Sequence, residues 1–153
     1  MPFVGGPYVQ AACFCDMVIR DNTNALSLIR VIDTLTHVES GPSPPEKMPP
    51  LTHALTLVLM LKSGKARGPV NLRIIPELPS AETAPEFGQT VDFEGGERGQ
   101  NIVLKLVFTF QKPGLYWFRV FLGDEELTAV PFRVKYSRTT VSSTPAPPPT
   151  ESG

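Results

Sequence analysis

The sequence is poor in the residues that most often carry chemistry. It contains 2 cysteines, 2 histidines and 1 tryptophan in 153 residues. Charged residues make up only 19% of the chain, and 14 Lys and Arg against 15 Asp and Glu give a net charge of −1. A nucleic-acid-binding surface needs a cluster of excess positive charge. The composition therefore argues against nucleic acid as a partner.

Long apolar runs and targeting features are also missing. The longest apolar run, 54–61, has 8 residues, whereas a membrane helix needs roughly 20. No Lys or Arg precedes Arg20, so the basic region of a secretory signal is absent. Cys13 and Cys15 are the only thiols, and two residues so close on one strand cannot form a disulfide without strain. We therefore expect a cytoplasmic protein with reduced cysteines and no membrane contact.

Proline, in contrast, is abundant, with 17 residues. An interior Pro costs a helix about 3 kcal/mol, so this frequency disfavours a helical bundle. Three segments, 41–50, 76–88 and 139–153, combine Pro with small or polar residues and are predicted to be irregular. The last has too few apolar groups to offset the entropy cost of ordering, which predicts a disordered tail. We expect one domain over 1–138, followed by that tail over 139–153.

Short apolar segments with a two-residue period lie between the irregular segments and predict strands. The first two, 8–20 and 25–33, flank the turn-forming run Asp21-Asn22-Thr23-Asn24 and predict a hairpin. Segment 51–62 is apolar on both faces of the predicted strand, which favours a central position. The remaining predicted strands are 70–74, 90–94, 101–110, 115–122 and 127–136. About eight short strands without a long helical period predict a sandwich rather than βαβ units.

The most informative stretch is Lys112-Pro113-Gly114-Leu115-Tyr116-Trp117-Phe118. It turns at Pro113-Gly114 and enters a strand with Tyr116 two residues after Gly114. This pattern is similar to the tyrosine corner of Greek-key sandwiches, in which a Tyr hydroxyl bonds back to the preceding connection. Phe118 occupies the position of the second core cysteine of antibody-type domains. Whether the stretch is a corner or an ordinary hairpin, Gly114, Tyr116 and Phe118 are predicted to have structural roles.

Two blocks of the sequence resemble a family of small bacterial proteins of unknown function. The first block is Ala12-Cys13-Phe14-Cys15-Asp16 followed by Leu26-Ser27-Leu28-Ile29-Arg30-Val31-Ile32-Asp33. The second is Pro113-Gly114-Leu115-Tyr116-Trp117-Phe118-Arg119-Val120 with Gly123 and Leu127. The resemblance implies an all-β, immunoglobulin-like antiparallel β-sandwich of about eight strands, and it implies no activity.

No group of residues has the pattern of a catalytic or cofactor site. The candidate zinc ligands are Cys13, Cys15, His37 and His53. Their spacing is not that of a zinc site, and the chain has no nucleophile elbow or phosphate-binding loop. Hairpin pairing could bring Asp16 near Asp33, and paired carboxylates can act as acid and base or bind a ligand. The simpler interpretation is that both accept backbone hydrogen bonds, so we expect no metal and no cofactor.

Surface recognition is the remaining class of function. On the predicted strand 115–122, Trp117, Arg119 and Phe121 share one face, and Tyr116 lies on the other. A two-sheet sandwich buries one face of each sheet, so the Trp117 side points outward if the Tyr116 side faces the core. Trp and Arg are enriched in binding hot spots.

We therefore predict a non-catalytic cytoplasmic protein-interaction or assembly module that binds a partner protein, or a second copy of itself, through this face. Two alternatives stay open. One is a β-sandwich that binds a small molecule. The other, which we favour least, is a hydrolase or lyase that uses Asp16 and Asp33.

Overall fold

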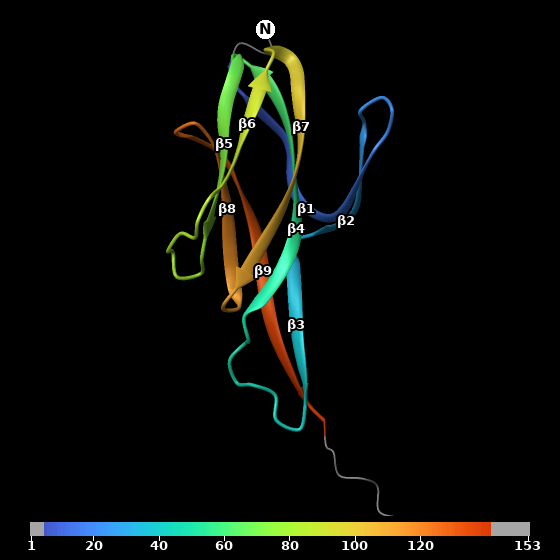
Figure 1. The fold of residues 1–153 in the computed structure, drawn as a ribbon, viewed down its shortest axis with the longest axis vertical. Coiled ribbons are helices and arrows are strands. Elements are labelled where there is room, and N and C mark those ends of the chain that lie inside the picture. The colour runs from blue at the N-terminus through green and yellow to red at the C-terminus, as the bar shows by residue number, and fades with distance from the viewer. Residues whose placement is uncertain (1–4, 142–153) are drawn as a thin grey trace, which may run out of the picture.

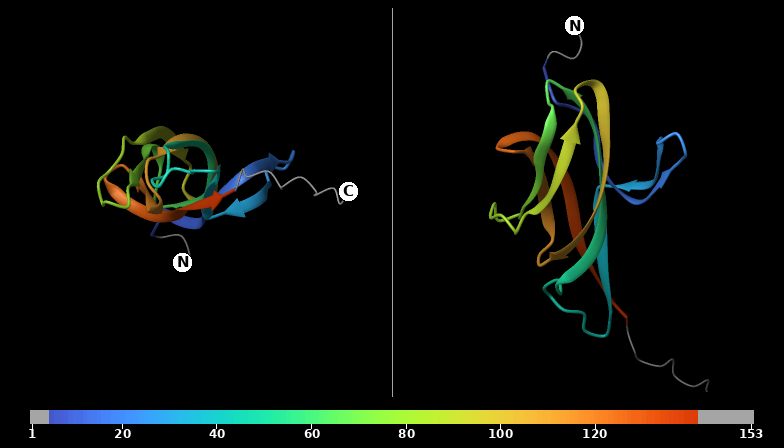
Figure 2. Two further views of the ribbon diagram at one scale, coloured as in Figure 1. Left: turned by 90° about the horizontal axis from the view of Figure 1, so that it is seen from below. Right: turned by 45° about the horizontal axis from the view of Figure 1, so that its top comes forward.

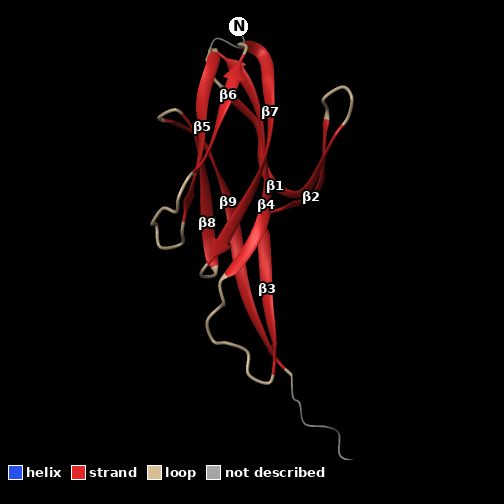
Figure 3. Ribbon diagram, in the orientation of Figure 1, coloured by secondary structure: helices blue, strands red, loops and turns tan. Residues whose placement is uncertain are grey.

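Nine β-strands and no helix make up residues 5–141, the part of the chain that the computed structural model describes (Figure 3). The strands are β1 (Tyr8–Arg20), β2 (Leu26–Ile32), β3 (Thr34–Gly41), β4 (Leu51–Gly64), β5 (Gly68–Glu77), β6 (Phe87–Phe93), β7 (Gly96–Phe110), β8 (Gly114–Leu122) and β9 (Glu125–Thr140). The all-β class and the β1–β2 hairpin are as predicted. The sequence predicted about eight strands, and the additional one is β3.

The strands form two sheets that pack face to face (Figure 1). The four-stranded sheet has the order β2-β1-β4-β7, and the five-stranded sheet has the order β3-β9-β8-β5-β6. All ladders are antiparallel except the one between β3 and β9, which is parallel. The predicted antiparallel pairing is therefore wrong for this one ladder. After Asp33 the chain passes from one sheet to the other and enters it in the direction of β9.

β4 is the central strand that its sequence predicts. It pairs with β1 on one side and with β7 on the other. Leu55, Leu57 and Leu59 face the core between the sheets, and Val58 on the opposite face is also fully buried. β1 and β7 satisfy the backbone hydrogen bonds of β4 on both edges, and its inward Leu side chains pack in the core between the sheets.

Aromatic side chains from both sheets meet in the core. Phe14 of β1 packs edge-on against Phe118 of β8, with ring centroids 5.0 Å apart. Phe110 of β7 packs edge-on against Tyr116 of β8 at 4.9 Å and stacks on Phe132 of β9 at 5.8 Å. Edge-to-face pairs add about 0.5–1.5 kcal/mol each beyond the area they bury. These contacts fix which face of β8 is inside.

The outer half of the β1–β2 hairpin projects from the side of the molecule (Figures 1 and 2). The ladder between β1 and β4 ends at the pair Cys15↔Thr56, whereas the ladder between β1 and β2 continues to Arg20↔Leu26. We call residues 16–32, which form this projection, the arm. The Arg20 guanidinium donates a hydrogen bond of 3.1 Å to the Asn101 carbonyl of β7 and so ties the end of the arm back to the body.

The first two predicted irregular segments are largely coil, at 42–50 and 78–86. β9 runs to Thr140, past the predicted domain end at residue 138, and the Val141 amide donates to the Gly41 carbonyl at 2.8 Å. Residues 142–153, where most of the predicted disordered tail falls, lie outside the described residues. Within 5–141 no helix is long and apolar enough to cross a membrane.

Candidate functional site

The candidate surface lies on the outer side of β8. Tyr116, Phe118 and Val120 are buried in the core, and the residues between them point outward and are partly buried. We call the outward set the Trp117 face; its members are Leu115, Trp117, Arg119 and Phe121. Trp117, Arg119 and Phe121 thus lie on one face of β8, on the side away from the core.

Two of these residues are already held by neighbours on the same sheet. Arg119 forms ion pairs with Glu126 at 2.8 Å and Glu77 at 2.5 Å, and both hydrogen bonds hold the pKa of its guanidinium above the ordinary value. The Arg73 guanidinium lies 5.6 Å from the centre of the Phe121 ring, a cation–π geometry. At this end of the Trp117 face, both Arg119 and Phe121 therefore already have partners within the chain.

The other end of the face has a different character. Trp117 lies opposite Pro131 of β9, and Leu115 lies opposite Arg133. Arg133 and Lys135 point away from the core and are exposed. Neither forms an ion pair with a carboxylate of the described residues. An apolar patch thus borders two basic side chains whose charge is not neutralised by a neighbouring acid.

The turn before β8 holds the structural residues of the predicted corner. The Tyr116 hydroxyl donates to the Lys112 carbonyl at 2.5 Å, which is the contact that the Pro-Gly-x-Tyr pattern predicts. Burial raises the pKa of this phenol. Gly114 has φ of +140°, and a Cβ there would come within 2.8 Å of Pro79. Phe118 is fully buried between Phe14 and Phe108.

The structure does not bring the two suspected carboxylates into contact. Asp16 forms an ion pair of 2.7 Å with Arg30, and both side chains are exposed. Asp33 lies just after β2 and accepts a hydrogen bond from the Thr34 hydroxyl at 3.0 Å. Since Phe14 pairs with Ile32, Asp33 falls three positions from Asp16 along the ladder, or about 10 Å at roughly 3.3 Å per residue. A shared proton or ligand would need a much closer pair.

The candidate metal ligands are also apart. Within residues 5–141 no group of three or more His, Cys, Asp and Glu side chains converges. His37 of β3 stacks on Tyr136 of β9 and bonds to Glu39 at 2.9 Å. Cys13 and Cys15 are free thiols, and burial raises the pKa of both, which disfavours the reactive thiolate.

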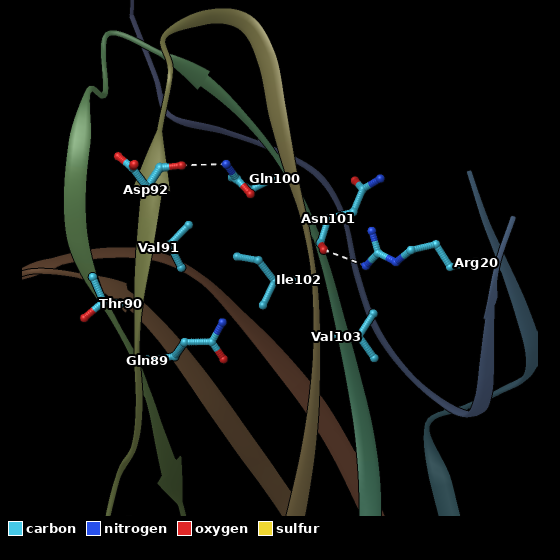
Figure 4. Close-up of a pocket in the computed structure, with 9 residues that line it drawn as sticks. All are labelled: Arg20, Gln89, Thr90, Val91, Asp92, Gln100, Asn101, Ile102 and Val103. Carbon is cyan, nitrogen blue, oxygen red and sulfur yellow. Dashed lines mark hydrogen bonds between the residues drawn. The ribbon is translucent and has the colours of Figure 1, made fainter. Parts of the chain in front are cut away.

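A polar hollow of about 350 Å³ opens between the edge strands β6 and β7 (Figure 4). The Gln100 side chain spans it to donate to the Asp92 carbonyl at 2.5 Å, and Val91 and Ile102 form its apolar base. A second groove of about 560 Å³ lies between the 46–50 segment and Tyr136. Neither hollow is lined by a Ser, Cys or His side chain.

The sequence did not indicate the most exposed apolar surface. Met17, Ile19, Ile29 and Val31 of the arm are 55%, 50%, 43% and 59% exposed. Alternating apolar residues on a strand indicate a face, but the same alternation occurs on covered and on open faces. This face is open because β1 extends beyond its ladder with β4. That extension is visible only in the fold.

Comparison with known families matches residues 10–135 to a family described as DUF6941, a family of unknown function. A search of curated proteins found no significant match. The family supplies no activity or ligand, so the function has to be argued from the residues themselves.

Proposed function

The chain belongs to the DUF6941 family, and we propose that it is a non-catalytic protein-interaction module with an immunoglobulin-like fold. The strand order supports the fold. With β2 and β3 set aside, the orders β1-β4-β7 and β9-β8-β5-β6 follow the A-B-E and G-F-C-C′ orders of immunoglobulin domains. On that correspondence β8 is strand F, where a tyrosine corner is found, and Tyr116 bonds back to Lys112.

The observation that carries the interaction role is the uneven distribution of charge around Trp117 on β8 and β9. Arg119 has carboxylate partners in Glu77 and Glu126, whereas Arg133 and Lys135 have none among the described residues. Trp117 lies between these two ends. The complementary partner is a protein surface that places an apolar side chain on Trp117 and carboxylates beside Arg133 and Lys135.

A non-catalytic role is supported by the separation of Asp16 from Asp33 and by the raised pKa of both thiols. The two free cysteines also support a reducing compartment, which we take to be the cytoplasm. Small-molecule binding in the groove beside Tyr136 is the alternative, because that groove is lined mainly by apolar groups.

The test is affinity capture with the full-length chain, followed by rebinding of each captured protein in purified form. Trp117→Ala removes the apolar contact, and Arg133→Glu reverses one charge. Lys105→Glu is the matched control, since Lys105 is also exposed and lies on the outer side of the other sheet. Folding of each variant is verified by cooperative thermal unfolding.

We expect Trp117→Ala to weaken a direct interaction by at least about 30-fold, as loss of a hot-spot residue does. Arg133→Glu should weaken binding and reduce its salt dependence, and Lys105→Glu should change neither. Wild-type affinity in the folded Trp117→Ala variant would refute the Trp117 face as the binding surface. Saturable binding of a small molecule in the groove would instead favour the alternative.

A further inference from the structure

The groove beside Tyr136 is lined by prolines, a methionine and an aromatic ring, and we call it the Tyr136 groove. Met48 in its wall is buried, whereas Pro50 and Pro113 are exposed. Tyr136 packs against the core, and its hydroxyl donates to the Pro45 carbonyl at 2.6 Å, which fixes the ring. An aromatic ring fixed among apolar groups is the kind of surface on which polyproline II segments dock.

Three polar side chains that line the Tyr136 groove have no partner within residues 5–141. The Gln111 amide forms no hydrogen bond, and Lys47 and Lys112 form no ion pair. An amide can donate to the carbonyls of a polyproline II helix, which have no bonds within that helix. Glu46 is the only carboxylate among the lining residues, so the two ammonium groups leave the groove positive. The groove therefore fits a proline-rich segment that carries an acidic residue.

The chain itself contains a segment of this composition. Residues 145–149, with the sequence Pro-Ala-Pro-Pro-Pro, lie outside the described residues, and Glu151 is the only charged residue of 142–153. A polyproline II helix has three residues per turn, so Pro145 and Pro148 share one edge of it. Proline loses little conformational freedom on docking, because its φ is already fixed. A segment too poor in apolar groups to build its own core can therefore still occupy a groove.

The end of β9 brings this segment within reach of the groove. The Val141 amide bonds to the Gly41 carbonyl, at the start of the loop that forms one wall of the groove, and both lie at the same end of the long axis (Figure 1). Tyr136 lies five residues back along β9, or about 16 Å at roughly 3.3 Å per residue. Residues 142–144, two Ser and one Thr, suit a reversal of the chain. Residues 145–149 then lie about 12–25 Å of chain from Val141, which spans the distance to Tyr136.

We propose that the Tyr136 groove is a polyproline II-binding site and that its occupant is segment 145–149 of the same chain. The shared edge of the two prolines faces the apolar lining, and Glu151 lies beside Lys112. The tether holds the segment at a local concentration of millimolar order, so a contact with Kd of about 1 mM is about half occupied. The proposal needs no second molecule and does not involve the Trp117 face.

Methyl NMR on the full-length chain, with its methionines labelled at the methyl carbon, tests the proposal. Met48 reports on the groove, and Met17 on the arm is the internal control. We expect nuclear Overhauser contacts between the Met48 methyl and proline ring protons. Pro145→Ser with Pro148→Ser should lower the docking equilibrium constant by about tenfold or more. The Met48 methyl and Gln111 amide signals should then shift, and the Met17 signal should not.

The matched control is Pro147→Ser with Pro149→Ser. It removes the same number of prolines from the run but leaves the shared edge intact, so the docking constant should change by about twofold or less. Glu151→Lys should lower the constant by about two- to fivefold, as loss of an exposed ion pair does. Lys112→Glu in the same chain should restore it, because the pair is then re-formed with its charges exchanged.

A mixed sample identifies which molecule supplies the prolines. Chains with labelled methionine and deuterated proline are mixed with unlabelled chains, so that a contact between Met48 and proline can arise only between two chains. We expect none. Such a contact would place the segment of a second copy in the groove and would overturn the proposal.

Identical Met48 and Gln111 signals in the wild type and in the Pro145→Ser, Pro148→Ser variant would overturn it as well. That comparison does not depend on folding, because both substitutions lie outside the described sandwich. Trp117→Ala should leave the contacts of Met48 with proline in place, which separates this inference from the proposed function.

Discussion

At the scale of single residues, hydrogen bonds between a side chain and the backbone hold the two turns that matter most. Tyr116 fastens the 111–114 turn before β8, and Asp21 fastens the tip of the arm. Each was identified in the sequence by its position among turn-forming residues, since local turn chemistry depends on neighbours in the chain. The conformation of Arg30 was not predicted from the sequence. Its positive φ of 55° and its ion pair with Asp16 depend on how β2 pairs with β1.

Tyr116→Phe should destabilise the fold by about 1 kcal/mol, because it removes the hydroxyl and leaves the ring packed. Denaturant unfolding measures this as a lower midpoint with an unchanged slope. Tyr136→Phe serves as the comparison, because the Tyr136 hydroxyl donates a hydrogen bond of 2.6 Å to the Pro45 carbonyl at an exposed site. If Tyr136→Phe lowers the free energy of unfolding as much as Tyr116→Phe does, the tyrosine corner stabilises the fold no more than an exposed hydrogen bond.

Asp21 should make the arm tip sensitive to acid. Its carboxylate accepts from the Thr23 hydroxyl at 2.6 Å and from the Thr23 and Ala25 amides, and these bonds lower its pKa. A lowered pKa means that the carboxylate stabilises the folded tip above its unfolded pKa of about 3.9. That stabilisation is lost as pH falls through the lower folded value. Amide NMR shifts of Thr23 and Ala25 should report this transition, which Asp21→Ala should abolish.

At the scale of elements, strands with a two-sided or one-sided apolar pattern were predictable, and β3 was not. β4 and β7 have patterns that specify their faces without reference to partners. β3 carries Thr34, Thr36 and Ser40 among its eight residues and gains its place only by pairing with β9, about a hundred residues later in the chain. Sequence pattern contains no information on such a distant, parallel partner.

Leu57→Ala should lower the free energy of unfolding by about 2–5 kcal/mol, because Leu57 is fully buried in the central strand. The substitution leaves a cavity that cannot collapse, since β4 is paired on both sides. Val107→Ala on β7 is the control, because Val107 is 63% exposed and should change stability by less than about 0.5 kcal/mol. Thermal or urea unfolding measures both. Equal losses would mean that β4 is not the centre of the packed core.

At the scale of the whole molecule, the sequence indicated two sheets and the outward direction of Trp117, Arg119 and Phe121, because period-two alternation settles which residues share a face. It did not indicate that Arg119 forms ion pairs with Glu77 and Glu126, whereas Arg133 forms no ion pair within residues 5–141. That difference depends on which strands lie beside β8. Nor did the sequence indicate the arm, which is exposed because β1 extends beyond its ladder with β4.

The parallel ladder between β3 and β9 has a mechanical consequence. β1 begins near one end of the long axis, and β9 ends near the other (Figure 1). Tension applied between these points pulls β9 along its length past both of its neighbours, β8 and β3, and β3 is held from the opposite end through the arm and β1. Ladder hydrogen bonds lie across the strands, so the eight register pairs from Thr34↔Arg133 to Gly41↔Thr140 bear the load together instead of opening one by one. The edge that the sequence failed to indicate thus adds a second ladder on β9 that resists stretching.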